Sequence, residues 1–90
     1  MPDLVKPFES KDEIRLNDGK YLIETSKGEI VYRTGKCKYW EQREQATKVA
    51  EYWSKQHAVY VHLYRLSGGF LRWVGYWVGG KPVKMNEMGF

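Results

Sequence analysis

Residues 58–78, which read AVYVHLYRLSGGFLRWVGYWV, decide the fold that this sequence predicts. Two runs, 58–66 and 70–78, are rich in Val, Leu, Tyr and Trp, the residue types that favour β-strands. Gly68 and Gly69 stand between the runs, and glycine readily adopts the positive φ angles that tight hairpin turns require. This stretch therefore predicts a long β-hairpin that turns at the glycine pair.

The register of this hairpin decides which side chains share a face. A two-residue turn at Gly68-Gly69 pairs Leu63 with Val74 and Val61 with Tyr76, so that one face is aliphatic apart from one tyrosine. A helix can cover such a face, and for this reason we favour the two-residue turn. The opposite face would then be aromatic, and it would carry Tyr60, His62, Tyr64, Trp73 and Trp77.

A three-residue loop with a bulge is the alternative for this turn. A slip of one residue moves every side chain of the second strand to the other face of the sheet. Trp73 and Trp77 would then join the aliphatic core, and Arg72 and Tyr76 would lie on the face of Tyr60, His62 and Tyr64. In both registers one face carries these three residues together with aromatic residues of the second strand.

Residues 41–56 have the periodicity of a helix rather than that of a strand. Apolar residues at positions i, i+3, i+4 and i+7 form one stripe, and the charges agree with the helix dipole, with acids in the first turn and bases near the end. The stripe consists of Ala46, Val49, Ala50 and Trp53. This segment is therefore predicted to be an amphipathic helix that packs on a sheet.

The N-terminal half predicts a second hairpin, formed by residues 20–25 and 29–34 around Lys27-Gly28. A two-residue turn there pairs Ile23 with Tyr32 and Thr25 with Ile30. The predicted core face of this hairpin consists of Tyr21, Ile23, Ile30 and Tyr32. Upstream, Ile14 to Leu16 are interpreted as a short strand before the turn at 17–19, in preference to a helix that begins with the capping-box pattern at 10–13.

These elements predict an α+β fold with a single antiparallel sheet of four to five strands, in the order (β)ββ-α-ββ, and one helix packed on one face. Residues 1–90 are predicted to form one domain, with 1–12 as a loose N-terminal arm. Gly79-Gly80 is expected to end the sheet and to leave 81–90 as a flexible C-terminal tail. Because one helix covers only one face, the aromatic face is expected to be open.

The distribution of charge indicates an anionic partner. The formal net charge is +4, and no acidic residue occurs between Glu51 and Glu87, so the hairpin side of the molecule should be electropositive. A basic surface that serves only solubility is the alternative interpretation. The lone Cys37 excludes an intramolecular disulfide and suits a reducing compartment. Residues 1–10 lack the apolar run of a signal peptide and no apolar run approaches membrane-spanning length, so neither element is expected. A cytoplasmic location without a membrane partner is expected.

Aromatic rings on a rigid sheet beside cations predict a small binding module that contacts nucleic acid, with single strands favoured. Bases stack on such rings for about 1–3 kcal/mol each, and lysine and arginine follow the phosphates. The predicted contact residues are Tyr60, His62, Tyr64, Arg65, Arg72, Trp73, Trp77, Lys81 and Lys84. A protein-interaction module, such as a small inhibitor, an accessory protein or a homodimer, is the alternative, because Tyr and Trp are also enriched at protein interfaces. A third interpretation places the arm or the tail over this face.

No pattern in the sequence indicates an enzyme, a metal site or a cofactor. His57 and His62 lie close in sequence, but no third metal ligand stands near them in the sequence. Cys37 stands between two lysines, yet no general base accompanies it. Arg65 and Arg72 are predicted to face each other near the hairpin tip, and two solvated arginines are favoured there over a pair bridged by an anion such as phosphate.

Overall fold

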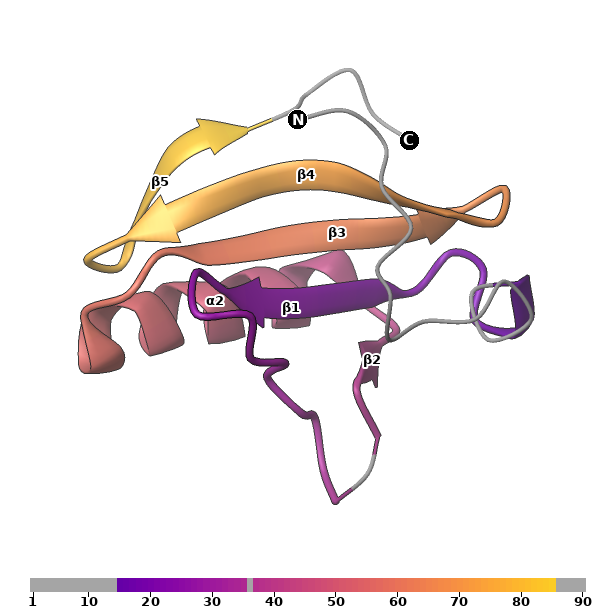
Figure 1. The fold of residues 1–90 in the computed structure, drawn as a ribbon, viewed down its shortest axis with the longest axis horizontal. Coiled ribbons are helices and arrows are strands. Elements are labelled where there is room, and N and C mark those ends of the chain that lie inside the picture. Colours follow the sequence, from indigo (N-terminus) through magenta and orange to yellow (C-terminus); the bar gives the residue numbers. More distant parts are fainter. Residues whose placement is uncertain (1–14, 36, 86–90) are drawn as a thin grey trace.

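The computed structural model describes residues 15–35 and 37–85. They form one antiparallel sheet of five strands with a helix packed on it, which confirms the predicted α+β fold (Figure 1). The elements in chain order are β1 (Tyr21–Thr25), β2 (Tyr39–Trp40), α2 (Arg43–His57), β3 (Val61–Ser67), β4 (Phe70–Val78) and β5 (Lys81–Met85). The strands lie in the order β2-β1-β3-β4-β5 across the sheet.

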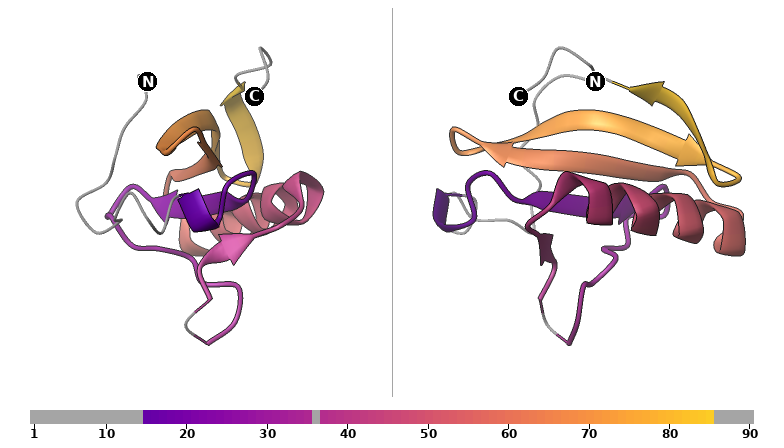
Figure 2. Two further views of the ribbon diagram at one scale, coloured as in Figure 1. Left: turned by 90° about the vertical axis from the view of Figure 1, so that its right-hand side faces the viewer. Right: turned by 180° about the vertical axis from the view of Figure 1, so that it is seen from behind.

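Helix α2 lies across one face of the sheet, where Figure 2 shows it in front of the strands in the view from behind. Ala46 and Ala50 are fully buried against the sheet, and Val49 and Trp53 pack at the margin of the same cluster. The apolar stripe predicted from the sequence is therefore confirmed. The helix ends at Ala58, whose φ of 52° places it in the left-handed conformation that commonly ends helices.

The turn between β3 and β4 is the predicted two-residue turn. Gly68 and Gly69 have φ angles of +61° and +85°, and the flanking strands pair Ser67 with Phe70. Tyr64 pairs with Trp73, as expected, but the next pair is Leu63 with Gly75. Val74 is thus an extra residue in β4, which makes a β-bulge.

This bulge changes the faces of the residues that follow it. Val61 pairs with Trp77 rather than with Tyr76, so both predicted pairs beyond the bulge are wrong. Trp77 is buried beneath α2, and Tyr76 lies on the opposite face. The structure therefore combines the two alternatives, with the first register near the tip and the shifted register beyond Val74. The shift buries the large apolar surface of the Trp77 indole in the core and leaves Tyr76 half-buried on the opposite face.

The N-terminal hairpin also differs from its prediction by one residue. Glu24 pairs with Ile30, and the amide of Val31 donates to the carbonyl of Ile23 at 3.0 Å. Val31 is therefore buried in the core, whereas Tyr32, predicted to lie there, is 52% exposed. The hydroxyl of Thr25 accepts from two amides of the turn, those of Lys27 and Glu29, and this stabilises a three-residue turn.

The neighbour of β1 on its outer side is β2, not the segment 29–34, which contributes only isolated bridges. Arg15 and Leu16 are helical, so the predicted strand is wrong for these two residues, and Ile14 and the capping box lie outside the described residues. The predicted N-terminal arm, residues 1–12, also lies outside them. The sheet does not stop at Gly79-Gly80, because these glycines form a second tight turn that leads into β5. Residues 86–90 of the predicted tail are not described.

One hydrogen bond joins α2 to the turn between β4 and β5. The hydroxyl of Ser54 accepts from the amide of Gly80 at 2.9 Å and donates to the carbonyl of Glu51 at 3.0 Å. Ser54 is fully buried, and a Cβ on Gly80 would lie 3.2 Å from the Cβ of Lys55. The helix and the turn therefore approach so closely that only a small side chain and a glycine fit.

Ser54→Ala is expected to lower the free energy of unfolding by about 1–3 kcal/mol, because it leaves the partly buried amide of Gly80 without its acceptor. Urea denaturation followed by circular dichroism measures this change. Thr47→Ala, a half-buried hydroxyl on the same helix, is the matched control and should change stability by less than about 0.5 kcal/mol. Equal effects of the two substitutions would show that the Ser54 hydrogen bond is not important for stability.

Candidate functional site

The face of the sheet opposite α2 carries a second buried cluster. Its buried members are Leu22, Tyr39, Tyr64, Leu66, Leu71 and Trp73. Tyr64 is 1% exposed and Trp73 is 7% exposed, so the expectation that the whole aromatic face is open is wrong. Trp77 lies on the other face and is fully buried under the helix. Residues 81–85 of the predicted tail form the edge strand β5 beside β4 and do not fold over this face, whereas the predicted arm and residues 86–90 lie outside the described residues.

Three rings at one end of this face form a stacked series, which we call the ladder: Tyr60, Tyr76 and His62. The ring centroids of Tyr60 and Tyr76 are 6.0 Å apart, and those of Tyr76 and His62 are 5.5 Å apart. The indole nitrogen of Trp73 donates to Nδ1 of His62 at 3.3 Å, and this hydrogen bond fixes the orientation of the imidazole. Tyr60 is 53% exposed, while His62 and Tyr76 are half-buried.

The sheet register places a cation beside the ladder. His62 pairs with Tyr76, and Tyr76 pairs with Lys84 of β5, so the three side chains lie in one row on the same face. Lys84 is exposed, and so is Lys81, which pairs with Val78 nearer the end of the sheet. On the other side of His62 the row continues to Glu24, which is buried.

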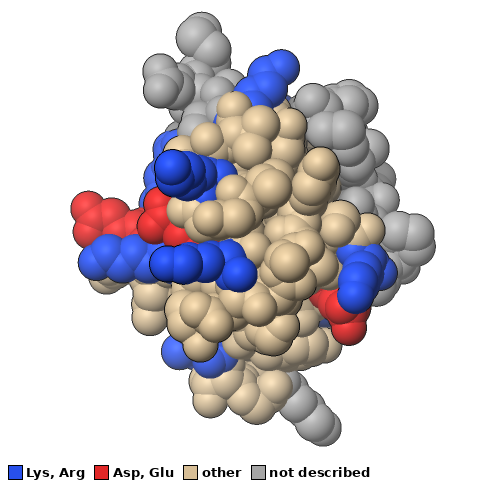
Figure 3. Space-filling model, turned by 90° about the vertical axis from the view of Figure 1, so that its left-hand side faces the viewer, with Lys and Arg blue, Asp and Glu red and all other residues tan. Residues whose placement is uncertain are grey.

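The turn between β4 and β5 lies at the end of the sheet opposite to the turn between β3 and β4 (Figure 1). In a view onto the end with the β4–β5 turn, lysine and arginine groups, with acidic groups beside some of them, border a broad surface without charged groups (Figure 3). This end of the molecule therefore combines uncharged surface with a margin on which basic groups are accompanied by some acidic groups.

Arg65 and Arg72 face each other directly across the strands, as the sequence predicted. Arg65 also pairs with Tyr21, which packs beneath α2, so the two arginines lie on the helix-bearing face at the β3–β4 tip. The predicted site is thus divided. Tyr60, His62, Lys81 and Lys84 lie on one face, and the arginines lie on the other face at the opposite end.

Tyr76 is the ladder residue that the preferred register placed on the wrong face. The bulge at Val74 moves it, and the signal that indicates such a bulge is Gly75, an isolated glycine inside a strand pattern. Tyr76 contacts the rings of Tyr60, His62 and Trp73, and it therefore joins the exposed part of the face to the buried part.

Cys37 has a specific cationic partner that the sequence did not identify. The guanidinium of Arg33 lies 3.2 Å from the Cys37 sulfur, across a tight turn in which Thr34 bridges to Cys37. This hydrogen bond from Arg33 is the main reason that the pKa of the Cys37 thiol is lowered from its usual value. The thiolate form is therefore more populated than in an unperturbed thiol at the same pH, although the described residues near it provide no catalytic base.

Arg33→Gln is expected to raise the pKa of the Cys37 thiol and to move the pH profile of its alkylation to higher pH. The sign follows from the charge, because removal of the guanidinium destabilises the thiolate while the neutral thiol is little affected. Rates of iodoacetamide modification between pH 6 and 10, in the range where thiols titrate, measure the shift. Lys27→Gln removes a positive charge from another loop and should leave the profile unchanged. Identical profiles in all three proteins would contradict the role of Arg33.

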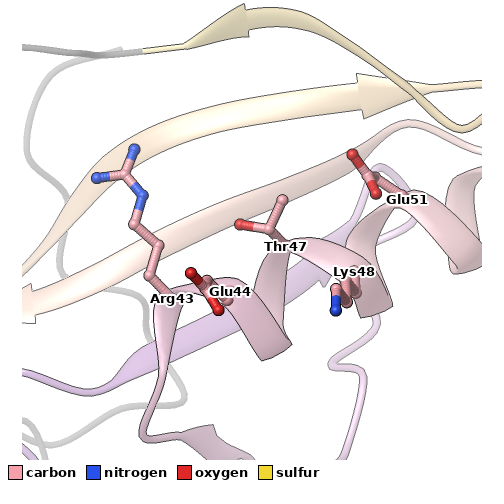
Figure 4. Close-up of a pocket in the computed structure, with 5 residues that line it drawn as sticks. All are labelled: Arg43, Glu44, Thr47, Lys48 and Glu51. Carbon is pink, nitrogen blue, oxygen red and sulfur yellow. The ribbon is translucent and has the colours of Figure 1, made fainter.

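A groove of about 520 Å³ runs along the exposed side of α2. Figure 4 shows its lining side chains projecting from successive turns of the helix, and they are Arg43, Glu44, Thr47, Lys48 and Glu51. Positive and negative groups alternate along the groove, so it favours no ligand of one charge. Among residues 15–35 and 37–85, no group of three or more His, Cys, Asp or Glu residues is arranged to hold a metal ion.

Comparison with known proteins finds no matching family model, no matching curated protein and no matching solved structure. Within the described part of the chain, no helix is long and apolar enough to cross a membrane. The ladder and its neighbouring lysines are therefore interpreted from their own geometry.

Proposed function

We propose that this chain is a small non-enzymatic module that contacts single-stranded nucleic acid through the ladder and the lysines of β5. The observation that carries the proposal is the exposed ring of Tyr60, stacked on Tyr76, with Lys84 in the same row as Tyr76. An aromatic platform beside a cation is the arrangement that sequence-tolerant single-strand binders use.

The spacing of the rings determines how a base binds. Insertion of a base between two rings requires about 6.8 Å, twice the 3.4 Å rise per stacked base. The ring centroids of the ladder are only 6.0 and 5.5 Å apart, so the rings already pack against one another. A base therefore stacks on the exposed side of Tyr60, and Tyr76 and His62 support that ring from behind.

The charges around the ladder favour a phosphate backbone. Lys81 and Lys84 are both exposed on β5, and the chain has no acidic residue from 52 to 86. The acid in the same row, Glu24, is buried rather than presented to solvent. With one exposed platform and two lysines, the affinity expected is modest, in the range of about 10⁻⁴–10⁻⁶ M that is typical of non-specific binding.

The experiment is a titration of a fluorescently labelled oligothymidine with the purified full chain, measured by anisotropy at two salt concentrations. Tyr60→Ala is expected to weaken binding by about 5- to 150-fold, which corresponds to the loss of one stacked base at 1–3 kcal/mol. Lys84→Gln should reduce the slope of log K against log salt by about 0.7, the value for one single-strand phosphate contact. Tyr52→Ala and Lys48→Gln, both exposed on α2, are the matched controls and should bind as the unmodified chain does.

Absence of binding at low salt, or binding that does not depend on salt, would refute the proposal. Sedimentation equilibrium distinguishes the alternative of a protein interface. A concentration-dependent dimer that Tyr60→Ala dissociates, without any binding of oligothymidine, would assign the same surface to contact between copies of this chain.

A further inference from the structure

Arginine side chains gather around the turn between β3 and β4. Arg65 and Arg72 are direct cross-strand neighbours on the face that bears α2. The turn itself has no side chains, and its two glycines leave room for the guanidinium groups. Nη2 of Arg72 lies 3.9 Å from the position of a Cβ on Gly68, and Nε of Arg15 lies 3.8 Å from that of a Cβ on Gly69.

Like charges directly opposite each other in a sheet are destabilising, and an anion bound between them removes that cost. Arg65 adds a second indication, because its Nε is buried and has no hydrogen-bond acceptor. An unsatisfied donor of a charged group is costly, and a bound ion at the donor would remove that cost. Arg65 is only partly buried as a whole, so the side chain can be reached from solvent.

One carboxylate lies close to this turn. Asp18 accepts a hydrogen bond from the amide of Gly68 at 3.1 Å, so one of its oxygens is engaged with the backbone. This contact fixes the segment that carries Arg15 against the turn, since Arg15 lies only three positions before Asp18 and its carbonyl accepts from the Asp18 amide at 3.2 Å. Asp18 therefore positions Arg15 and also adds a negative charge that opposes an incoming anion.

We propose that Arg15, Arg65 and Arg72 form a binding site for a phosphate group at the β3–β4 turn. The planar guanidinium donates two parallel hydrogen bonds to an oxyanion, and the several oxygens of phosphate allow more than one arginine to bind at once. The site lies on the opposite face and at the opposite end of the hairpin from the ladder. It is therefore independent of the proposed single-strand surface, and either one can fail without the other.

The test follows the side-chain Nε–H resonances of the arginines in ¹⁵N-labelled full chain by NMR, during titration with inorganic phosphate. Sodium chloride at equal ionic strength is the reference titration. We expect saturable shifts of the Arg65 and Arg72 resonances with phosphate and not with chloride. A second arm compares a 5′-phosphorylated oligothymidine with the same oligomer lacking that phosphate, which separates a free or terminal phosphate from the phosphodiester backbone as the source.

Substitutions at the turn sharpen the assignment. Arg72→Gln should weaken phosphate binding about tenfold or more, as expected for the loss of a charge-assisted pair. Arg72→Lys keeps the charge but loses the planar fork and should recover only part of the affinity. Arg15→Gln, at an exposed position, should weaken binding without affecting the fold. Asp18→Asn retains an oxygen acceptor for Gly68, removes the negative charge and should strengthen phosphate binding.

The matched control is Lys27→Gln, which removes one positive charge from the exposed turn after β1. It should leave the phosphate affinity unchanged. Equal shifts with phosphate and chloride, or equal weakening by Lys27→Gln and Arg72→Gln, would overturn the site in favour of general attraction by net charge. Loss of phosphate binding in Arg72→Gln with oligothymidine binding at the ladder intact would support the site and confirm its independence.

Discussion

Replacement of Trp77 by alanine is expected to lower the free energy of unfolding by about 3–5 kcal/mol. Trp77 is fully buried beneath α2, where it packs with Val61, Leu63 and Val74. Removal of the indole loses the largest fully buried side chain and leaves a cavity that the sheet and the helix cannot easily close. A domain of this size is stable by only about 5–13 kcal/mol, so this one change removes a large share of the total.

Urea denaturation monitored by far-ultraviolet circular dichroism measures the loss. Trp77→Phe should cost less than the alanine substitution, because the cavity is smaller and because the buried indole nitrogen has no hydrogen-bond partner to lose. Tyr76→Ala is the control from the adjacent position, since Tyr76 is half-buried on the opposite face. A larger loss at Tyr76 than at Trp77 would mean that the bulge at Val74 is absent and that the regular register is correct.

Tyr64→Ala is expected to lower the free energy of unfolding by a similar amount, about 3–5 kcal/mol. The sequence placed this residue among the contacts for a partner, but Tyr64 is almost fully buried, in a cluster with Leu22, Leu66 and Trp73. A buried ring offers no surface for stacking, so its main effect is on stability rather than on binding.

Tyr60→Ala is the matched control for Tyr64→Ala, because both tyrosines project from the same face and only Tyr60 is largely exposed. The control should cost less than about 1 kcal/mol of stability. The same urea titrations, together with thermal melts, measure both variants. A small loss for Tyr64→Ala would show that this side chain is accessible, and it would then return to the list of contact residues.

The helix and the fold class were predictable because their signals are strong and local. The stripe from Ala46 to Trp53 repeats with a helical period, and the glycine pair at 68–69 defines a two-residue turn. A single amphipathic helix beside two hairpins leaves few arrangements other than a helix on an antiparallel sheet. These features hold even where individual residue pairs were predicted incorrectly.

The pairing of residues was less predictable, because a single extra residue changes the face of everything beyond it. The bulge at Val74 places Trp77 in the core. The three-residue turn after Thr25 places Val31 in the core beneath α2, where Ile30 was predicted. Both errors arose from the assumption of the shortest turn or the most regular strand. A glycine inside β4 and a threonine able to accept from turn amides were the available signals.

The candidate site was predictable in its residue types but not in its extent. One end of a single face does carry Tyr60, His62, Lys81 and Lys84. Tyr64 and Trp73 are buried because they belong to a second apolar cluster, which the alternation of apolar and polar residues does not reveal. The edge strand β5 was missed because Lys81, Pro82 and Lys84 are unusual in central strands. They are common at sheet edges, where charge and proline discourage further pairing.

The order of strands in the sheet has a consequence for how the molecule forms. Strands β3, β4 and β5 are consecutive and are joined by two-residue turns, so each pairing closes a loop of minimal length. The loop that is closed when β1 pairs with β3 is much longer, because it contains β2 and the whole of α2. Loop-closure entropy therefore favours early pairing of β3, β4 and β5, whereas the pairing of β1 with β3 closes a longer loop and carries a larger entropic cost.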